Sequence, residues 1–222
     1  MSLPAPTLLV ITDRRQARRA LEDVIAAALD GGARWISLRE KDLPPAERVA
    51  LAARLVALAQ PYRAIVMMHE DVDAAAQAGA GGVHLPSGGD PATARRRLGR
   101  AALVGVSAHS AAELQAAATR GADYVTVSPI FASASKPGYG PILGVPALGA
   151  LVGGAAIPVI ALGGVTETTA ADCRAAGAAG IAVMGQVMRA ADPHRTTAAL
   201  VAALGRAPSP ASPLAAPGRG SG

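Results

Sequence analysis

The chain has 222 residues, of which 51% are hydrophobic and 17% charged, so it can bury one sizeable core and is short for two domains. Aromatic residues make up only 2%, which argues against a nucleic-acid platform of stacked bases, and the single cysteine, Cys173, excludes an internal disulfide and a multi-cysteine metal site. The formal charge of +5 suits an anionic small molecule as well as a polyanion.

The sequence shows no signal for a membrane or for secretion. No apolar run approaches the roughly 20 residues that a membrane span needs. The first residues lack the basic stretch and apolar core of a signal peptide. We therefore expect a cytoplasmic protein.

Short apolar runs rich in β-branched residues alternate with longer Ala-rich stretches along the chain. Strands are predicted, in order, at residues 8–12, 34–38, 64–68, 82–85, 102–106, 124–127, 157–162 and 180–184. A helix is predicted after each strand, at residues 18–30, 45–59, 72–78, 91–98, 111–120, 146–152, 167–176 and 193–204. Several of these helices end in Gly, which is a stop signal.

Strands that alternate with helices predict a parallel sheet covered by helices. Eight such units close most simply as a single (β/α)8 TIM barrel, an α/β fold, which we place at residues 7–205. A doubly wound open sheet is the structural alternative. Residues 206–222 are mostly Pro, Ser, Gly and Ala with little to bury, so we predict a disordered tail there.

Glycines follow the last two predicted strands, at the rim where the active site of such a barrel lies. Gly163 and Gly164 come after the seventh strand and Gly185 after the eighth, where these barrels often bind phosphate through backbone N–H groups. The alternative is that they are turn glycines with positive φ. Their position in the barrel favours phosphate binding.

Cations occur at the same rim. Arg39 and Lys41 flank Glu40 directly after the second strand, and both a guanidinium fork and a lysine point charge suit phosphate oxygens. Lys136, in the long loop after the sixth strand, is a candidate loop cation over an anionic ligand. Loop charges are often merely solvated, but three convergent cations beside a glycine phosphate site predict a doubly anionic substrate set.

Other chemistry-bearing residues allow two interpretations. His69, Glu70 and Asp71 follow the third strand. Either the three ligate a divalent metal, since oxygen donors beside a pyrophosphate suit Mg²⁺, or Glu70 and Asp71 cap the helix that begins there. A structural role is expected for His84, at a barrel strand end, and Cys173 is expected to be a small buried hydrophobe. His109 is expected at the surface.

Eight segments occur together and in order: residues 9–13 (LVITD), 37–41 (SLREK), 82–85 (GVHL), 105–109 (GVSAH), 122–125 (ADYV), 128–131 (SPIF), 158–164 (PVIALGG) and 180–184 (GIAVM). With them the chain resembles the thiamine phosphate synthase/TenI family over about residues 8–189. The family fold is a (β/α)8 barrel, in agreement with the strand and helix pattern.

The resemblance implies a thiamine phosphate synthase, a transferase of thiamine biosynthesis. Such an enzyme joins 4-amino-2-methyl-5-hydroxymethylpyrimidine pyrophosphate to thiazole phosphate, which releases pyrophosphate and gives thiamine phosphate. The implied partners are these small phosphorylated substrates, with Mg²⁺ as cofactor. The composition and hydropathy predict neither a nucleic-acid nor a membrane partner, and the sequence leaves the question of a homo-oligomer open. The protein's own work is electrostatic stabilisation and positioning.

The resemblance also implies roles for single residues. Arg39 and Lys41 would hold the pyrophosphate, and Lys136 would stabilise it as it departs. The implied substrate-binding residues are Ser37, His69, Ser107, Ser133, Ser135, Gly163, Gly164, Met184 and Gly185. The implied ligands of Mg²⁺ are Glu70 and Asp90.

The chain departs from the synthase pattern at several of these positions. Ser37 stands where synthases usually have Gln, and His69-Glu70 where they have Asn-Asp. Gly89 replaces the second acidic ligand, with Asp90 one residue later.

Residues 86–88 are instead similar to the TenI branch, which isomerises a thiazole carboxylate phosphate tautomer, although the histidine that this branch uses is Pro129 here. A TenI-like thiazole tautomerase and a non-catalytic paralogue that binds thiazole or thiamine phosphate are the alternatives to the synthase.

Overall fold

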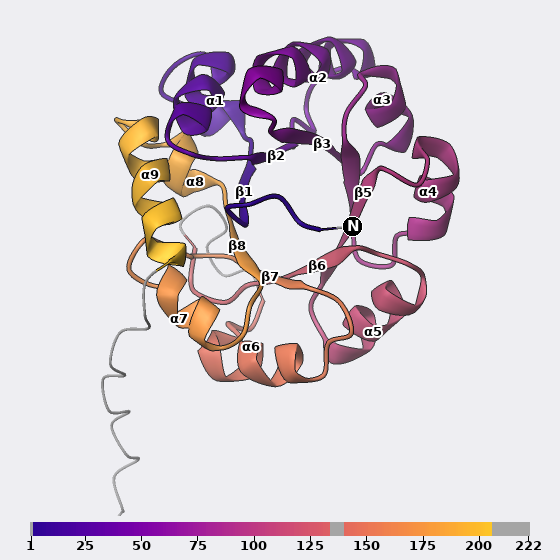
Figure 1. Ribbon diagram of the computed structural model, residues 1–222, viewed down its shortest axis with the longest axis vertical. Coiled ribbons are helices and arrows are strands. Elements are labelled where there is room, and N and C mark those ends of the chain that lie inside the picture. Colours follow the sequence, from indigo (N-terminus) through magenta and orange to yellow (C-terminus); the bar gives the residue numbers. More distant parts are fainter. Residues whose placement is uncertain (1, 134–139, 206–222) are drawn as a thin grey trace, which may run out of the picture.

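Eight parallel strands close into one barrel in chain order, and a computed structural model describes residues 2–133 and 140–205 of it. Each strand pairs with the next, and β8 returns to pair with β1. Figure 1 shows the helices as an outer ring around these strands. The predicted (β/α)8 barrel is therefore confirmed, and the open sheet is excluded.

The strands are β1 (Leu8–Ile11), β2 (Trp35–Leu38), β3 (Ile65–His69), β4 (Gly82–Leu85), β5 (Leu103–Ala108), β6 (Tyr124–Val127), β7 (Val159–Leu162) and β8 (Gly180–Val183). The α-helices are α1 (Leu21–Asp30), α2 (Pro45–Ala59), α3 (Val72–Gln77), α4 (Pro91–Leu98), α5 (Ala111–Thr119), α6 (Gly144–Gly153), α7 (Ala170–Ala175), α8 (Gly185–Met188) and α9 (Pro193–Leu204). Two short 3-10 helices are η1 (Arg14–Gln16) and η2 (Gln60–Tyr62). Each predicted strand and helix is present.

The structure differs from the sequence prediction mainly at element ends. The first helix begins at Leu21 and not at residue 18, because the chain first forms η1, which Asp13 caps by accepting from the backbone N–H of Arg15. β5 runs on to Ala108, so Ser107 lies inside the strand. The single turn of α8 was not predicted, since four residues are too short to show a helical period.

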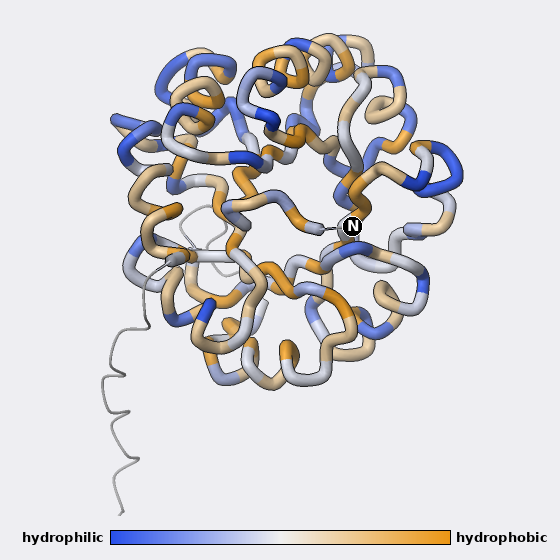
Figure 2. The backbone as a smooth tube through the Cα atoms, viewed as in Figure 1, coloured by the Kyte–Doolittle hydropathy of each residue, from blue (hydrophilic) through white to orange (hydrophobic). Residues whose placement is uncertain are grey.

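Alternation along the strands divides the core into two layers. One layer fills the barrel interior, with Leu9, Trp35, Met67, Leu103, Tyr124 and Ile160 among its members. The other lies between the strands and the helices, with Ile36, Leu55, Val104, Leu148 and Leu200 among its members. Figure 2 shows hydrophobic residues along the strands and hydrophilic residues on the outer ring. Burying each large apolar side chain contributes about 1.5–3 kcal/mol.

The two ends of the barrel differ. The segment before β1 crosses the amino end of the strands in Figure 1, and Leu3 packs there against the interior layer. The carboxyl end carries the polar residues that the sequence places after the strands. The barrel is thus covered at its amino end, and its polar residues gather at its carboxyl end.

The structure tests only some of the remaining sequence predictions. Cys173 is buried in α7, as expected. In the described ranges no helix is long and apolar enough to cross a bilayer. The predicted tail at residues 206–222, together with Ser135 and Lys136, lies outside the described residues. The cytoplasmic location and a homo-oligomer stay predictions.

Candidate active site

Polar side chains occupy the barrel interior at the carboxyl ends of five neighbouring strands. They are Ser37 on β2, His69 on β3, His84 on β4, Ser107 on β5 and Thr126 on β6. The rings of His69 and His84 stack with centroids 5.5 Å apart. Ser37 is fully buried, and its Oγ has no hydrogen-bond partner among the described residues. This polar layer forms the floor of the candidate site.

His84 is held at three points inside this layer. Its Nδ1 lies 3.0 Å from the Tyr124 hydroxyl, and its Nε2 lies 3.0 Å from Ser107 Oγ and 3.3 Å from Thr126 Oγ1. Burial lowers the pKa of His84 to about 3, with a smaller contribution from His69, so the ring is neutral. A Cβ at Gly105 would collide with the Tyr124 ring, so glycine is required there.

The cations after β2 stand on a loop that is anchored to the end of β1. The backbone N–H of Arg39 donates to Thr12 Oγ1 at 2.9 Å. Glu40 is 1% exposed, and its carboxylate accepts from the backbone N–H of Arg14 at 3.0 and 3.2 Å and from the Arg14 guanidinium at 3.2 Å. Lys41 stays about half exposed. Burying the acid therefore leaves the two cations at the rim.

A cavity of about 390 Å³ lies beside these cations, above the ends of β2 and β3. Its lining residues are Arg39, Glu40, Lys41, Arg48, His69, Glu70 and Asp71. Lys41 Nζ pairs with Glu70 at 2.6 Å, and Arg48 pairs with Asp71 at 2.6 Å. Within the described ranges no carboxylate pairs with Arg39. The cavity thus brings together three cations, one of them without an ionic partner in that part of the chain.

The acidic residues of the rim have different local roles. Asp71 caps α3 by accepting from the backbone N–H of Ala74 at 2.9 Å, as one of the two interpretations predicted. Asp90 caps α4: one carboxylate oxygen accepts from Ala92 N–H at 3.0 Å and the other from the Thr93 hydroxyl. Glu70, with φ of +68°, caps no helix and faces Lys41.

The glycines after β7 are required by a close approach of the loop that follows β6. Gly163 and Gly164 have φ of +95° and +66°, and a Cβ at Gly163 would lie 2.9 Å from Pro129 Cα. A Cβ at Gly164 would collide with the carbonyl oxygen of Ala132. The turn-glycine interpretation therefore holds for both residues, and phosphate binding by their backbone stays a prediction.

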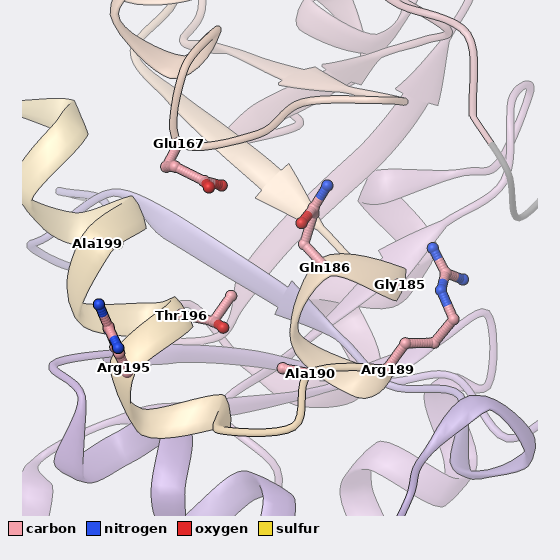
Figure 3. A pocket seen from close by; sticks show the side chains of 8 residues that line it. All are labelled: Glu167, Gly185, Gln186, Arg189, Ala190, Arg195, Thr196 and Ala199. Carbon is pink, nitrogen blue, oxygen red and sulfur yellow. The ribbon is translucent and has the colours of Figure 1, made fainter.

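A second cavity of about 390 Å³ begins at Gly185, at the carboxyl end of β8. Figure 3 shows the Glu167 side chain directed toward the side of the cavity where Gln186 stands, while Arg189 extends past Gly185. The guanidinium of Arg189 occupies the space that a side chain at Gly185 would need, and it donates to Gln16 Oε1. A cation therefore lies directly beside one of the predicted phosphate-binding glycines.

The other predicted site residues lie in three places. Met184 precedes α8 directly, and Ser133 is half-buried in the loop after β6. Ser135 and Lys136 lie outside the described residues. His109 is exposed, as expected, with its Nδ1 2.9 Å from the carbonyl oxygen of Ser128.

Sequence reasoning missed several residues of the site. Arg48 lies in the first turn of α2, and the topology could have indicated it, because a helix that follows a barrel strand begins at the same rim. No local signal marks Thr12 as an anchor of the Arg39 backbone, nor Tyr124 as a partner of His84. Arg189 lies one helical turn after Gly185, so its contact with Gly185 is local, whereas its bond to Gln16 is a tertiary feature.

Comparisons with known proteins agree with the fold and identify the family. The profile of the thiamine monophosphate synthase family matches residues 8–187. The thiamine-phosphate synthase of Roseiflexus castenholzii is 40% identical over 86% of this chain and 85% of that protein, and the thiamine-phosphate synthase of Methanoculleus marisnigri is 38% identical over 83% and 89%. A solved structure, thiamine phosphate pyrophosphorylase from Pyrococcus furiosus, gives a TM-score of 0.80 at 31% identity and covers 89% of this chain and 95% of that one. The chain belongs to the thiamine monophosphate synthase family.

Proposed function

We propose that the chain acts as a thiamine-phosphate synthase, a transferase of thiamine biosynthesis, with its reaction at the carboxyl end of the barrel. Family membership over residues 8–187 carries the activity. The cavity that gathers Arg39, Lys41 and Arg48 supports the location. The proposed substrates are the pyrimidine pyrophosphate and the thiazole phosphate.

Binding of the pyrophosphate group is the proposed task of the cations around this cavity. Arg39 offers its guanidinium fork to two phosphate oxygens, and Lys41 adds a point charge. Lys41 and Arg48 are held by Glu70 and Asp71 before the substrate arrives, so little reorganisation is needed when an anion enters. Lys136 is proposed to stabilise the same group as it departs, by the resemblance alone.

Mg²⁺ fits this cavity only together with the substrate. The described part of the chain holds no group of three or more His, Cys, Asp or Glu side chains that could bind a metal by itself. Mg²⁺ typically uses one or two carboxylates and takes its other oxygens from phosphate and water. Glu70, partly exposed in the cavity wall, fits one such ligand. Asp90 is the second proposed ligand, although both its oxygens already bond at the start of α4. A bound Mg²⁺ would neutralise part of the pyrophosphate charge.

The pyrimidine is proposed to lie over the polar layer, against Ser37, His69 and Ser107. The bond between its methylene carbon and the pyrophosphate oxygen breaks, and the electron pair leaves with the pyrophosphate. The thiazole nitrogen then supplies the pair for the new carbon–nitrogen bond. Ser133 and Ser135, with the backbone of Gly163, Gly164, Met184 and Gly185, are proposed to hold the thiazole phosphate so that this nitrogen faces the carbon.

Pyrophosphate release from the purified full chain tests the proposal. Release should require both substrates and should increase with Mg²⁺. Lys136→Ala should remove most of the release and leave the melting temperature unchanged. Arg54→Ala, which removes an exposed cation paired with Glu22 far from the cavity, is the control and should keep full activity. Folded wild-type protein without release would favour the tautomerase or the non-catalytic paralogue.

A further inference from the structure

We propose that His84 and Tyr124 are positioning residues, which fix the direction of the hydrogen bond that the Ser107 hydroxyl offers to the substrate. The hydrogen-bond chain itself follows from the geometry. Its meaning for catalysis rests on the proposed function, in which Ser107 faces the pyrimidine.

The chain begins at the Tyr124 hydroxyl, which is buried and can donate one hydrogen. Among the residues that the structure describes, two acceptors lie near it: His84 Nδ1 at 3.0 Å and Met67 Sδ at 3.6 Å. An imidazole nitrogen is a good acceptor and a thioether sulfur a weak one, and Met67 Sδ already accepts from Trp35 Nε1 at 2.8 Å. The Tyr124 hydroxyl therefore donates to His84 Nδ1.

This donation determines the tautomer of His84. The neutral ring carries one hydrogen, and Nδ1 has become an acceptor, so the hydrogen is on Nε2. Nε2 lies closer to Ser107 Oγ, at 3.0 Å, than to Thr126 Oγ1, at 3.3 Å. His84 therefore donates to Ser107, and the hydroxyl hydrogen of Ser107 is left for another acceptor.

The packing around Tyr124 keeps this arrangement in place. The edge of its ring meets Trp35 with centroids 4.7 Å apart, and its flank lies over Gly105 where a side chain would collide. Ser107 is only half-buried and stands at the open end of the barrel. Its fixed donor consequently selects a substrate atom with a lone pair, such as a ring nitrogen of an aminopyrimidine, over an amino group.

The tautomer of His84 can be measured in the full chain without any substrate. Two-bond ¹H–¹⁵N correlations of the uniformly labelled protein separate the Nε2–H form from the Nδ1–H form. The chain has 4 histidines, and His84→Gln assigns the signal by its loss. The expected result is the Nε2–H form in the wild type and a mixture in Tyr124→Phe. An Nδ1–H form in the wild type would overturn the proposal, whether or not the variants fold.

Kinetics then test the effect on the reaction. Losing one oriented hydrogen bond should lower kcat/KM for the pyrimidine pyrophosphate about tenfold in Ser107→Ala and severalfold in Tyr124→Phe. Tyr62→Phe, the same change at a tyrosine whose exposed hydroxyl donates to Asp30 outside the site, is the control and should stay within about twofold. Folded Tyr124→Phe protein with wild-type kcat/KM would overturn the positioning role. Wild-type protein without pyrophosphate release would instead contradict the proposed function, since the tautomer is read independently of turnover.

Discussion

At the scale of single residues, a buried carboxylate controls where two cations stand. Glu40 is 1% exposed, although it lies between Arg39 and Lys41 in the sequence. Burying a charge is costly unless it is bonded, and Glu40 is bonded to both the backbone N–H and the guanidinium of Arg14. The short η1 helix after β1 therefore fixes the loop that presents the proposed pyrophosphate-binding side chains.

Glu40→Gln should loosen this loop without changing its size. The amide turns an NH₂ group toward the donors of Arg14, and charge-assisted bonds of this kind are worth about 1.5–3 kcal/mol each. We expect the KM for the pyrimidine pyrophosphate to rise about tenfold and the melting temperature to fall. Steady-state kinetics and thermal unfolding measure both. Glu22→Gln, the same change in an exposed pair with Arg54, should leave both values as they are. An unchanged KM in Glu40→Gln would remove the anchoring role.

Glu70 and Asp90 can be separated as candidate Mg²⁺ ligands. Glu70→Gln should raise the Mg²⁺ concentration for half-maximal pyrophosphate release severalfold, because it removes a partly exposed carboxylate of the cavity wall that is the proposed ligand. Asp90→Asn keeps the cap of α4, since Asn caps as well as Asp. Its shift should be smaller, because both Asp90 oxygens are already bonded. An unchanged Mg²⁺ titration of Glu70→Gln would make Glu70 only the partner of Lys41.

At the scale of elements, the turn after β7 and the loop after β6 depend on each other. Phe131 N–H donates to the carbonyl of Gly163 at 2.9 Å, and Ala132 lies where a side chain on Gly164 would stand. The proposed thiazole phosphate site is built from both segments. A change in the turn is therefore expected to move the loop.

Gly164→Ala tests this dependence, with Gly121→Ala as its matched control. Both residues have positive φ, +66° and +86°, but nothing lies within 4 Å of a Cβ at Gly121. The control should be less stable by the backbone penalty alone, about 1–2 kcal/mol, and its kinetic constants should not change. Gly164→Ala should lose clearly more stability and raise the KM for thiazole phosphate. Equal losses in urea unfolding, with equal kinetics, would show that the two segments are independent.

The same elements show how far sequence reasoning reaches. Periodicity and stop signals gave β4, α4, β6 and α9 with the correct bounds. β4, β6 and α9 contain apolar residues in the expected pattern, and α4 is bounded by Pro91 and Gly99. The cations after β2 were found because they adjoin a strand end. Sequence reasoning did not find the burial of Glu40, the contact of Tyr124 with His84 or the bond of Arg189 to Gln16. Each of these joins residues that are distant in the sequence, and no local pattern encodes such contacts.

At the scale of the whole molecule, lysine is rare and arginine is common. The sequence has 21 Lys plus Arg, of which only Lys41 and Lys136 are lysines. The arginines in the described ranges serve mostly as outer ion pairs and caps of carbonyls, such as Arg97 with Asp73 and Arg34 with Leu29. Both lysines, in contrast, belong to the proposed pyrophosphate site. A reagent that modifies lysine amines therefore reports almost entirely on that site.

Acetylation by an amine-reactive reagent should be slowed by pyrophosphate at both lysines. At ten times its Kd, the anion leaves about one site in eleven free, so the rate at Lys41 should fall about tenfold. Peptide mass spectrometry follows each lysine separately, and the chain's α-amine reports on the reagent itself. Sulfate at equal ionic strength is the control for screening, which weakens exposed charges such as Lys41 in general. The contrary outcome is that pyrophosphate protects Lys136 while Lys41 reacts as fast as it does in sulfate. That result would place the pyrophosphate at the loop after β6 and not in the cavity beside β2.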